Sequence, residues 1–575
     1  MRDYLTRRKV IGAIGTGSLV ACAPQVPESY SALTERAIGT FAHGIASGDP
    51  TANSVILWTR ITPDNPRGGS VDVTWEVSET ESFNTLAASG TFATNSARNW
   101  TVKVDATRLM AGRQYAYRFK VGAHTSPMGL TKTLPDGALD KARFAVVSCS
   151  NWQHGYFNAY DHIARQDHFD ALIHLGDYYY EYGADYYLNE DMRAAGRLHE
   201  PRHEIITLDD YRMRHAQYRS DPALQAVTAK MPLITIWDDH ETSNDSWRTG
   251  ADNHDEGEGD WEARKEAALR AYYEWMPIRD PRPGRLKEDI FRAYEYGDLL
   301  TLVTLETRLL ARNEPIVIDD YFSELRENGA DDFKANVLND PNRNMLGQTQ
   351  LDFIASTLRQ SKAAGKPWRM LANQVLMGKL HTPDMAPYVN EEAMVAIEQA
   401  WAGVRQFVEL SKYNLPVYPD SWDGYPVARE TLYSRLKTEG VEDILVVTGD
   451  AHEFWVNDLR ADDDTKLGVE LCTTSVSSET LRAFMGEGVA DYALLLTQSN
   501  ADVRYYNALH NGYLDLELTP HSGKARMVGI STVAQQDYDV FDVASFTVKP
   551  QKNSLTVSQP KGLNLKQRAL FSGLG

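Results

Sequence analysis

Side chains that can bind metal ions follow four short apolar runs in this sequence. The runs are FAVVS, ALIHLG, LITIW and ILVVTG, and each has the composition of a buried β-strand. Thiol, carboxylate, phenol and imidazole groups come shortly after them: Cys149, Asp177, Tyr180, Asp239, His240, Asp450 and His452. Because ligands of α/β proteins bind at the carboxyl ends of strands, we expect these side chains to meet. Together they predict a polynuclear metal site.

Cys149 is one of three cysteines, and three interpretations of its role are open. They are a disulfide with Cys472, an inert buried thiol, and a thiolate that binds a metal ion. A disulfide would close an unusually long loop, and both cysteines lie in apolar, strand-like runs. Since three other strand ends also carry ligand-type residues, the sequence favours the metal thiolate.

The first part of the chain, residues 40–135, contains only strand signals. Segments such as VDVTWEV and QYAYRFKV alternate in period two, and Gly, Asn and Pro separate them at short intervals. This pattern predicts a small antiparallel β-sandwich of the immunoglobulin or fibronectin type III kind. A Pro/Ser/Glu-rich linker over 22–39 precedes it.

After residue 143, strand-like runs alternate with helical patterns. The alternation predicts an α/β domain whose sheets are covered by helices, over about 140–550, with a C-terminal tail over 551–575. We expect strands at 143–149, 171–175, 233–237, 290–306, 368–377, 443–448, 468–476, 512–519 and 524–532. We expect helices at 155–166, 208–230, 260–276, 348–363 and 428–438.

The N-terminus has the pattern of an export signal. Arg7 and Arg8 form a twin arginine, and an apolar stretch too short to span a membrane runs from Val10 to Ala21. LVAC, which ends at Cys22, resembles the lipobox of bacterial lipoproteins, in which the cysteine is acylated. We expect a signal peptide over 1–21, folded-state export by the twin-arginine translocase, and lipid attachment at Cys22. The alternative is an ordinary cleaved signal.

The formal net charge of −20 limits the partners. Nucleic-acid binding needs clustered Lys and Arg, so no nucleic-acid partner is expected. Hard cations, which carboxylates bind, are compatible with this charge. The acidic stretch 251–262 does not have the spacing of an EF-hand loop, and we interpret it as a solvated loop.

The strand-end motifs resemble those of the metallophosphoesterases. That superfamily carries an acid after its first strand and then G-D-x-x-[DY], G-N-H-E and G-H-x-H. This sequence has Cys149, GDYYY, DDHE and GDAH, departures that are similar to the PhoD-type alkaline phosphatases. Further segments from about residue 41 to 532 also resemble that family: SGDPTANSVILWTR, CSNWQHGYFNAY, LDDYRMRHAQY, LETR, NQVLMGKL and NGYLDLELTP.

The resemblance implies a four-layer α/β/β/α catalytic domain, phosphomonoesterase and phosphodiesterase activity, and a site for Fe3+ and Ca2+. Cys149, Asp177 and Tyr180 would give ferric iron three anionic ligands, with His452 as the fourth. A tyrosine at the place of Tyr180 also resembles the iron-binding tyrosine of purple acid phosphatases. The alternative for Tyr180 is aromatic packing in its Tyr-rich loop.

The second metal position would be bridged by Asp177 and held by Asp239 and Asp450. The superfamily has Asn and His at the last two places, so an oxygen replaces a nitrogen donor here, which favours calcium. Asn244 is close enough in the sequence to add another oxygen.

The resemblance assigns catalytic work to His240, which stands at the place of the superfamily's NHE histidine. It would orient the phosphate or protonate the leaving oxygen, while metal-activated hydroxide attacks phosphorus at neutral to alkaline pH. The alternative for His240 is a partner of Asp239. Arg308, in LETR, would bind the phosphate of a small phosphoester substrate. Glu306 replaces the aspartate that is more common there.

Two other functions remain open from the residues. One is a phosphodiesterase of the phospholipase D or nuclease type, which keeps the site and changes the substrate. The other is a non-enzymatic surface lipoprotein whose sandwich binds glycans or protein. In each case the protein would be periplasmic or in the cell envelope, and would touch the membrane only through its lipid anchor.

Overall fold

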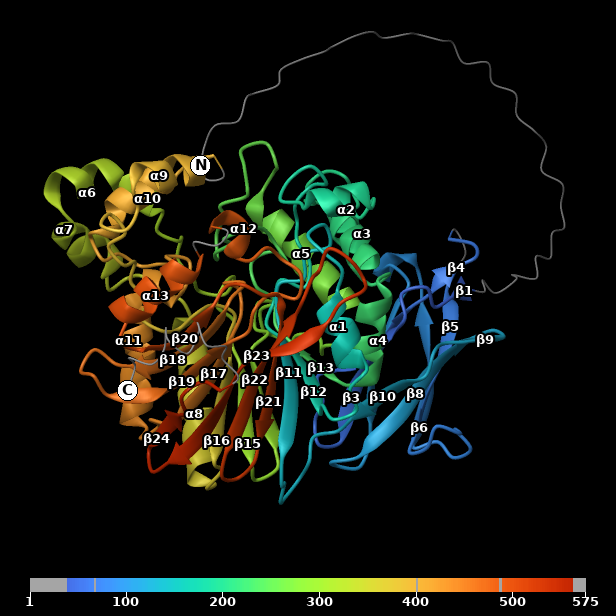
Figure 1. Ribbon diagram of the computed structural model, residues 1–575. Helices are drawn as coiled ribbons and strands as arrows, with labels where there is room; N and C mark the ends of the chain where they lie inside the picture. The colour runs from blue at the N-terminus through green and yellow to red at the C-terminus, as the bar shows by residue number, and fades with distance from the viewer. Residues whose placement is uncertain (1–38, 67–68, 400–401, 486–488, 562–575) are drawn as a thin grey trace, which may run out of the picture.

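The computed structural model describes residues 39–66, 69–399, 402–485 and 489–561. The signal expected over 1–21, its Cys22 and nearly all of the linker lie outside the described residues. Within them the chain has the expected mixed α/β fold with an antiparallel sheet near its N-terminus (Figure 1). No described helix is both long and apolar enough to cross a membrane.

The larger of the two main sheets has ten strands in the order β24-β23-β22-β21-β11-β12-β13-β2-β3-β7. Its centre is parallel, because β11, β12, β13 and β2 run in the same direction, whereas β21 pairs with β11 in the antiparallel sense. The strands are β2 (Ile45–Gly48), β3 (Ser54–Arg60), β7 (Thr101–Thr107), β11 (Ala142–Val147), β12 (Ala171–His174), β13 (Leu233–Thr235), β21 (Gly512–Leu518), β22 (Gly523–Ile530), β23 (Val540–Gln551) and β24 (Ser554–Val557).

The second main sheet has seven strands in the order β14-β15-β16-β17-β19-β18-β20. Four neighbouring strands, from β15 to β19 in this order, are parallel. The strands are β14 (Arg292–Tyr296), β15 (Leu300–Thr304), β16 (Trp368–Ala372), β17 (Ile444–Thr448), β18 (Phe454–Arg460), β19 (Lys466–Cys472) and β20 (Val503–Asn507).

The apolar runs of the second sheet are buried on both faces. Met370 and Leu445 belong to the core shared with the larger sheet, whereas Leu371 and Val446 belong to the core under the outer helices. This alternation follows from the period of two in a strand. Phe144 of β11 and Tyr296 of β14 meet edge to face across the two sheets, with ring centroids 5.1 Å apart.

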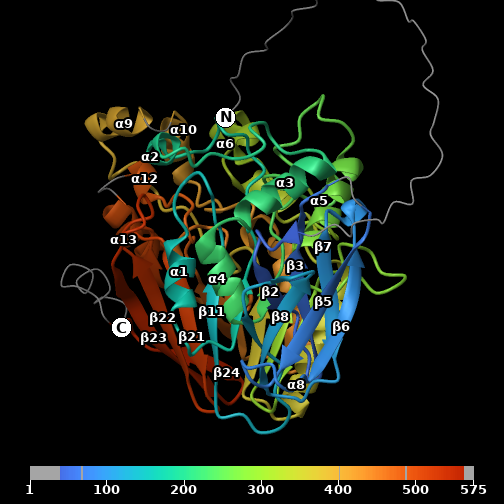
Figure 2. The same ribbon diagram turned by 90° about the vertical axis from the view of Figure 1, so that its right-hand side faces the viewer.

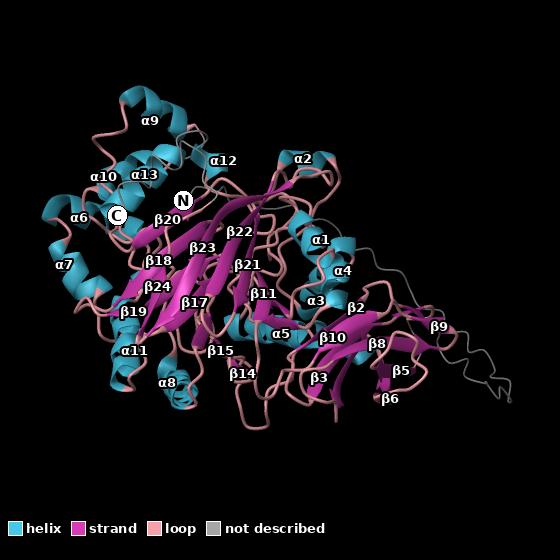
Figure 3. Ribbon diagram, turned by 60° about the horizontal axis from the view of Figure 1, so that its bottom comes forward, coloured by secondary structure: helices cyan, strands magenta, loops and turns pink. Residues whose placement is uncertain are grey.

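Helices cover the outer faces of the two sheets (Figure 3). On the side of the larger sheet lie α1 (Asn158–Ala164), α3 (Leu208–Tyr218), α4 (Pro222–Lys230) and α5 (Trp261–Trp275). On the side of the second sheet lie α8 (Gly347–Ala363) and α11 (Pro426–Thr438). The remaining α-helices are α2 (Glu190–Ala194), α6 (Phe322–Asn328), α7 (Asp331–Phe333), α9 (Glu391–Glu398), α10 (Val404–Ser411), α12 (Arg482–Met485) and α13 (Val489–Ser499).

The N-terminal strands form a sandwich that shares one sheet with the rest of the molecule (Figure 2). One side is a separate sheet of β5 (Val71–Ser78), β6 (Ala88–Thr94), β8 (Gln114–Val121), β9 (His124–Thr125) and β10 (Gly129–Lys132). The other side is β2, β3 and β7, which continue the ten-stranded sheet through the pairing of Gly48 with Leu233. The strand pattern predicts the sandwich, but not this continuity.

Two segments differ from the sequence-based expectation. The helix expected over 208–230 is broken into α3 and α4, because Asp221 caps a new helix and Pro222 starts it. The segment expected to be a tail from residue 551 contains β24, which pairs with β23 at the sheet edge.

Candidate metal centre

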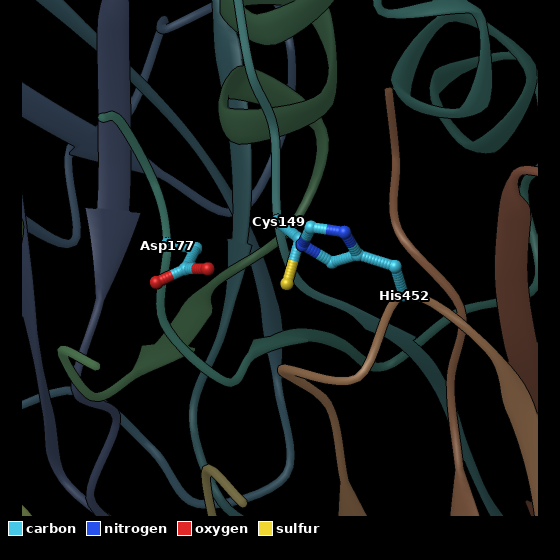
Figure 4. Close-up of side chains that lie close together, drawn as sticks. All are labelled: Cys149, Asp177 and His452. Atoms are coloured by element: carbon cyan, nitrogen blue, oxygen red, sulfur yellow. The ribbon is translucent and has the colours of Figure 1, made fainter. Parts of the chain in front are cut away.

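The ligand-type residues of the four strand ends lie together where the carboxyl ends of the two sheets meet. Three overlapping groups each have ligand atoms within 4.8 Å of one another. They are Cys149, Asp177 and His452; Asp177, Asp239 and His240; and Asp177, Asp238, Asp239 and Asp450. Figure 4 shows the first group, whose three side chains converge from separate segments. Asp177 belongs to all three groups, as a ligand that bridges two ions would.

Four of these residues have a left-handed backbone conformation. The φ angle is 61° at Cys149, 54° at Asp177, 64° at Asp450 and 59° at His452. Non-glycine residues rarely adopt this conformation, and it is concentrated at functional sites. Each of the four follows a strand end closely, so the chain turns sharply where it presents a ligand.

The loop that carries Asp177 is held by Gly176 and Glu241. A Cβ atom at Gly176 would lie 2.4 Å from the backbone N of Asp238, so only glycine lets the two loops approach this closely. The buried Glu241 carboxylate accepts the backbone N–H groups of Asp177 at 3.1 Å, Tyr178 at 2.7 Å and Asp238 at 2.8 Å. The glycine of GDYYY and the glutamate of DDHE therefore position the ligand loops.

The donor set of this cluster fits metal cations. One carboxylate oxygen each of Asp177, Asp238 and Asp239 is buried without a hydrogen-bond partner among the described residues. Burial raises the pKa of the Cys149 thiol well above its ordinary value, and the carboxylates of Asp177 and Asp450 raise it further. Bound cations would give the oxygens a partner and stabilise the thiolate.

Cys149 and Cys472 are both free and buried, which excludes the disulfide between them in this structure. Cys472 lies at the end of β19, outside the three groups of ligand atoms, and its thiol donates to the carbonyl of Gly449 at 3.5 Å. Of the two thiols, Cys149 therefore has the surroundings of a ligand.

Tyr180 and His452 complete the thiol side of the cluster. The Tyr180 hydroxyl donates to Asp177 Oδ2 at 3.1 Å and lies 3.2 Å from His452 Nε2. His452 Nδ1 lies 2.7 Å from the carbonyl oxygen of Glu479, which places its proton there and leaves Nε2 free to bind an ion. The phenol oxygen of Tyr180 thus lies among ligand atoms, although its ring also packs on other aromatic rings.

Asp238 also belongs to the carboxylate group, although the sequence alone assigned no role to this residue. It stands directly before Asp239 in DDHE, and that adjacency is the signal that could have identified it. Asn244 has other contacts, since its side-chain oxygen accepts the Tyr182 hydroxyl at 3.0 Å and its backbone N–H donates to Glu181 at 2.7 Å. Metal binding by Asn244 stays a prediction.

Arg308 is fully buried among carboxylates. Its guanidinium donates to Asp238, to Asp420 at 2.5 Å and to Asp450 at 3.4 Å. Nearby Glu306 accepts the backbone N–H of Arg308 at 3.0 Å, so the glutamate shapes the LETR turn. In this arrangement Arg308 neutralises and orients the carboxylates of the cluster, while its expected contact with substrate phosphate stays a prediction.

His240 is paired with a buried carboxylate. Its Nδ1 lies 2.6 Å from Glu181 Oε2, and Glu181 is held in turn by the backbone N–H of Asn244 and the Asn253 amide at 2.8 Å. Burial lowers the pKa of His240, but the carboxylates of Glu181, Asp239 and Asp177 outweigh burial and raise it well above its ordinary value. The imidazole can therefore carry a proton next to the cluster. Sequence reasoning missed Glu181.

Two packed sheets with an anionic cluster of metal-type ligands at their carboxyl ends define a candidate metalloprotein of the α/β class. Residues 144–527 match the family model described as PhoD-like phosphatase, and residues 27–135 match that described as PhoD-like phosphatase, N-terminal domain. The chain belongs to the PhoD-like phosphatase family. It is therefore a phosphoric ester hydrolase that depends on metal ions.

Two relatives show the extent of this similarity. The chain is 32% identical to alkaline phosphatase D of Bacillus subtilis (strain 168) over 570 residues, which is 96% of this chain and 88% of the relative. A solved structure described as the structure of PhoD matches with a TM-score of 0.73 and 30% identity, and covers 95% of this chain and 98% of that chain. The expectation of a PhoD-type phosphatase is confirmed.

Proposed function

We propose that the protein hydrolyses small phosphomonoesters and phosphodiesters at neutral to alkaline pH with a centre of Fe3+ and Ca2+. One observation carries the proposal: thiol, carboxylate and imidazole ligand atoms are gathered within 4.8 Å in three groups that share Asp177. When bound, the two ions would supply the Lewis acidity that activates water and neutralises charge on the phosphoryl oxygens.

The iron would be held by Cys149, Asp177, Tyr180 and His452. Three of these ligands become anionic on binding, which suits a trivalent ion, and His452 presents Nε2 to the cluster. Tyr180 joins the ligands through its phenol oxygen, 3.1 Å from Asp177.

The calcium would be held by Asp239 and Asp450 together with the bridging Asp177. Every donor in this group is a carboxylate oxygen, the ligand type that calcium prefers, and Asp238 supplies a further carboxylate. Asn244 would join through the second lone pair of its side-chain oxygen, which also accepts the hydroxyl of Tyr182.

The protein's own groups would orient the ester and supply the proton. His240, kept protonated by Glu181, would donate its proton to the oxygen of the leaving group. Arg308 would hold Asp238 and Asp450 in place. The phosphate contact expected of Arg308 would use a guanidinium N–H that is not donated to Asp238, Asp420 or Asp450.

We also propose that the protein is exported in the folded state by the twin-arginine translocase and anchored by a lipid on Cys22. The support is the sequence alone, namely the twin arginine and LVAC. The protein would act in the periplasm or cell envelope, without a nucleic-acid partner.

Elemental analysis of purified, export-processed protein tests the centre, together with turnover of a phosphomonoester, a phosphodiester and single-stranded DNA. We expect iron and calcium in the protein and hydrolysis of the two small esters. Zinc as the sole metal would refute the proposed ions, and faster hydrolysis of DNA would favour the nuclease-type alternative.

A further inference from the structure

An exposed aromatic ring lies two ring contacts away from His240. Tyr186 is 62% exposed, and its ring lies on that of Tyr182, with centroids 4.8 Å apart. The Tyr182 ring meets the His240 ring edge to face at 5.2 Å. The rings of Tyr186, Tyr182 and His240 therefore form a continuous aromatic path from the solvent to the metal centre.

Hydrogen bonds and ring packing from buried residues fix the backbone of the loop that carries Tyr186. The side-chain amide of Gln153, which is fully buried, donates to the carbonyl oxygens of Tyr186 at 2.6 Å and Gly183 at 3.1 Å. Tyr187 has a φ of 47°, and its ring packs on His154 with centroids 4.3 Å apart. The chain thus turns Tyr187 inward and holds Tyr186 outward on a fixed backbone.

We propose that Tyr186, supported by the buried ring of Tyr182, forms a subsite that stacks on a flat, neutral aromatic ring in the leaving group of the phosphoester. The inference rests on the proposed function, in which the phosphate of the substrate lies at the metal centre. The leaving group then extends from the centre toward the solvent, past the rings of His240 and Tyr182 to the exposed ring of Tyr186. Stacking on aromatic side chains is a general way to bind flat rings.

The two carboxylates that flank Tyr186 in the sequence share one cation, which weakens their attraction for a cationic leaving group. Asp185 and Glu190 are both paired with Arg193, at 3.4 and 3.3 Å. A cationic group would be bound best by an aromatic ring next to an unpaired carboxylate. Both nearby carboxylates already share a cation.

The test compares the metal-loaded protein with Tyr186→Ala and Tyr186→Phe on four phosphomonoesters. The substrates are p-nitrophenyl phosphate, adenosine monophosphate, glycerol phosphate and phosphocholine. In Tyr186→Ala we expect kcat/KM for one or both ring substrates to fall about fivefold to tenfold relative to glycerol phosphate, whereas Tyr186→Phe keeps the wild-type ratio. If kcat/KM falls for p-nitrophenyl phosphate alone, the subsite binds simple aryl groups. If it falls for adenosine monophosphate, the subsite binds nucleobases.

Tyr388→Ala is the matched control. Tyr388 is 66% exposed and lies on a different loop, before α9, so we expect this variant to keep all the wild-type ratios. The inhibition constants of phenylphosphonate and methylphosphonate give a second measurement that does not depend on turnover. In Tyr186→Ala we expect the inhibition constant of phenylphosphonate to rise and that of methylphosphonate to stay unchanged.

An equal loss on all four substrates in Tyr186→Ala would overturn the subsite and make Tyr186 a support of its loop. A fall in kcat/KM confined to phosphocholine would refute the binding of a neutral ring and show that the subsite binds a cationic leaving group. A wild-type protein that hydrolysed none of the four esters would instead refute the proposed function itself.

Discussion

At the scale of single residues, Cys149 gives the sharpest prediction. In the proposed centre, replacement by alanine would remove one anionic ligand from the trivalent ion. We expect Cys149→Ala to lose most of its iron and to lower kcat/KM more than about 100-fold. This loss exceeds that typical of substitutions at residues that only hydrogen-bond to a metal ligand. Metal content by elemental analysis and the sulfur-to-iron absorption band in the visible spectrum measure the effect.

Cys149→Asp keeps the negative charge and a similar reach, so we expect it to retain part of the iron and of the activity without the sulfur-derived colour. Cys472→Ala is the control, because Cys472 is an equally buried free thiol outside the cluster. Full iron and full turnover in Cys149→Ala would show that this thiol only fills the core.

The pairing of Glu181 with His240 predicts a change in pH dependence. Glu181 is one of the carboxylates that raise the pKa of His240, so Glu181→Gln should lower that pKa. A histidine that acts as a proton donor works only below its pKa, and the alkaline limb of the kcat/KM profile should therefore move to lower pH. At alkaline pH we expect activity to fall about tenfold to a hundredfold.

Glutamine keeps the acceptor oxygen for the N–H of Asn244, so the fold should be preserved. Glu190→Gln, at an exposed glutamate of α2, should leave the pH profile unchanged. An unshifted alkaline limb in Glu181→Gln would show that His240 is not the group whose proton matters.

At the scale of elements, the junction of β13 with β2 depends on Gly48. A Cβ atom at this position would lie 2.6 Å from the carbonyl oxygens of Leu233 and Pro277, both of which belong to the backbone. We expect Gly48→Ala to lower the free energy of unfolding by about 1–3 kcal/mol. Urea denaturation followed by tryptophan fluorescence measures the change.

Gly69→Ala is the matched control, since a Cβ atom there would have no neighbour within 4 Å. Its stability should stay within about 0.5 kcal/mol of the wild type, as for most surface substitutions. Equal stability of the two alanine variants would contradict this prediction, because β2 and β13 would then move apart without a loss of free energy of unfolding.

The sequence predicts well which ligand-type side chains lie together, because each follows a recognisable apolar run by a few residues. Asp177 and Asp450 are examples. It could not identify Glu181, whose partner His240 is 59 residues away and is brought near only by the fold. Nor could it show that Arg308 is surrounded by carboxylates, since Asp420 comes from a segment without a motif. Pairing of β2 with β13 likewise depends on a long-range contact.

At the scale of the whole molecule, the N-terminal sequence predicts how the protein is attached to the cell. If Cys22 carries a lipid, Cys22→Ser should move the protein from the membrane fraction to the soluble fraction, because the anchor is lost. Immunoblots of the two fractions measure this, and mass spectrometry of the wild type should find the acyl mass on the N-terminal peptide. Replacement of Arg7 and Arg8 by lysines should stop export instead.

A Cys22→Ser protein that stays in the membrane fraction, together with a wild type without acyl mass, would contradict lipid attachment. Ser29→Ala is a suitable control, because Ser29 lies in the same linker and outside LVAC.

The ten-stranded sheet joins strands from both ends of the chain, and this has a consequence for biosynthesis. β11 lies between β12 and β21, and β21 begins only at Gly512. Until the ribosome has made β21, β11, with its buried residues Phe144 and Val146, has one edge without its partner strand. Such an edge invites pairing with other nascent chains. Messenger RNAs that end before the codon for Gly512 should therefore yield protein that aggregates or is degraded, and no partly active enzyme.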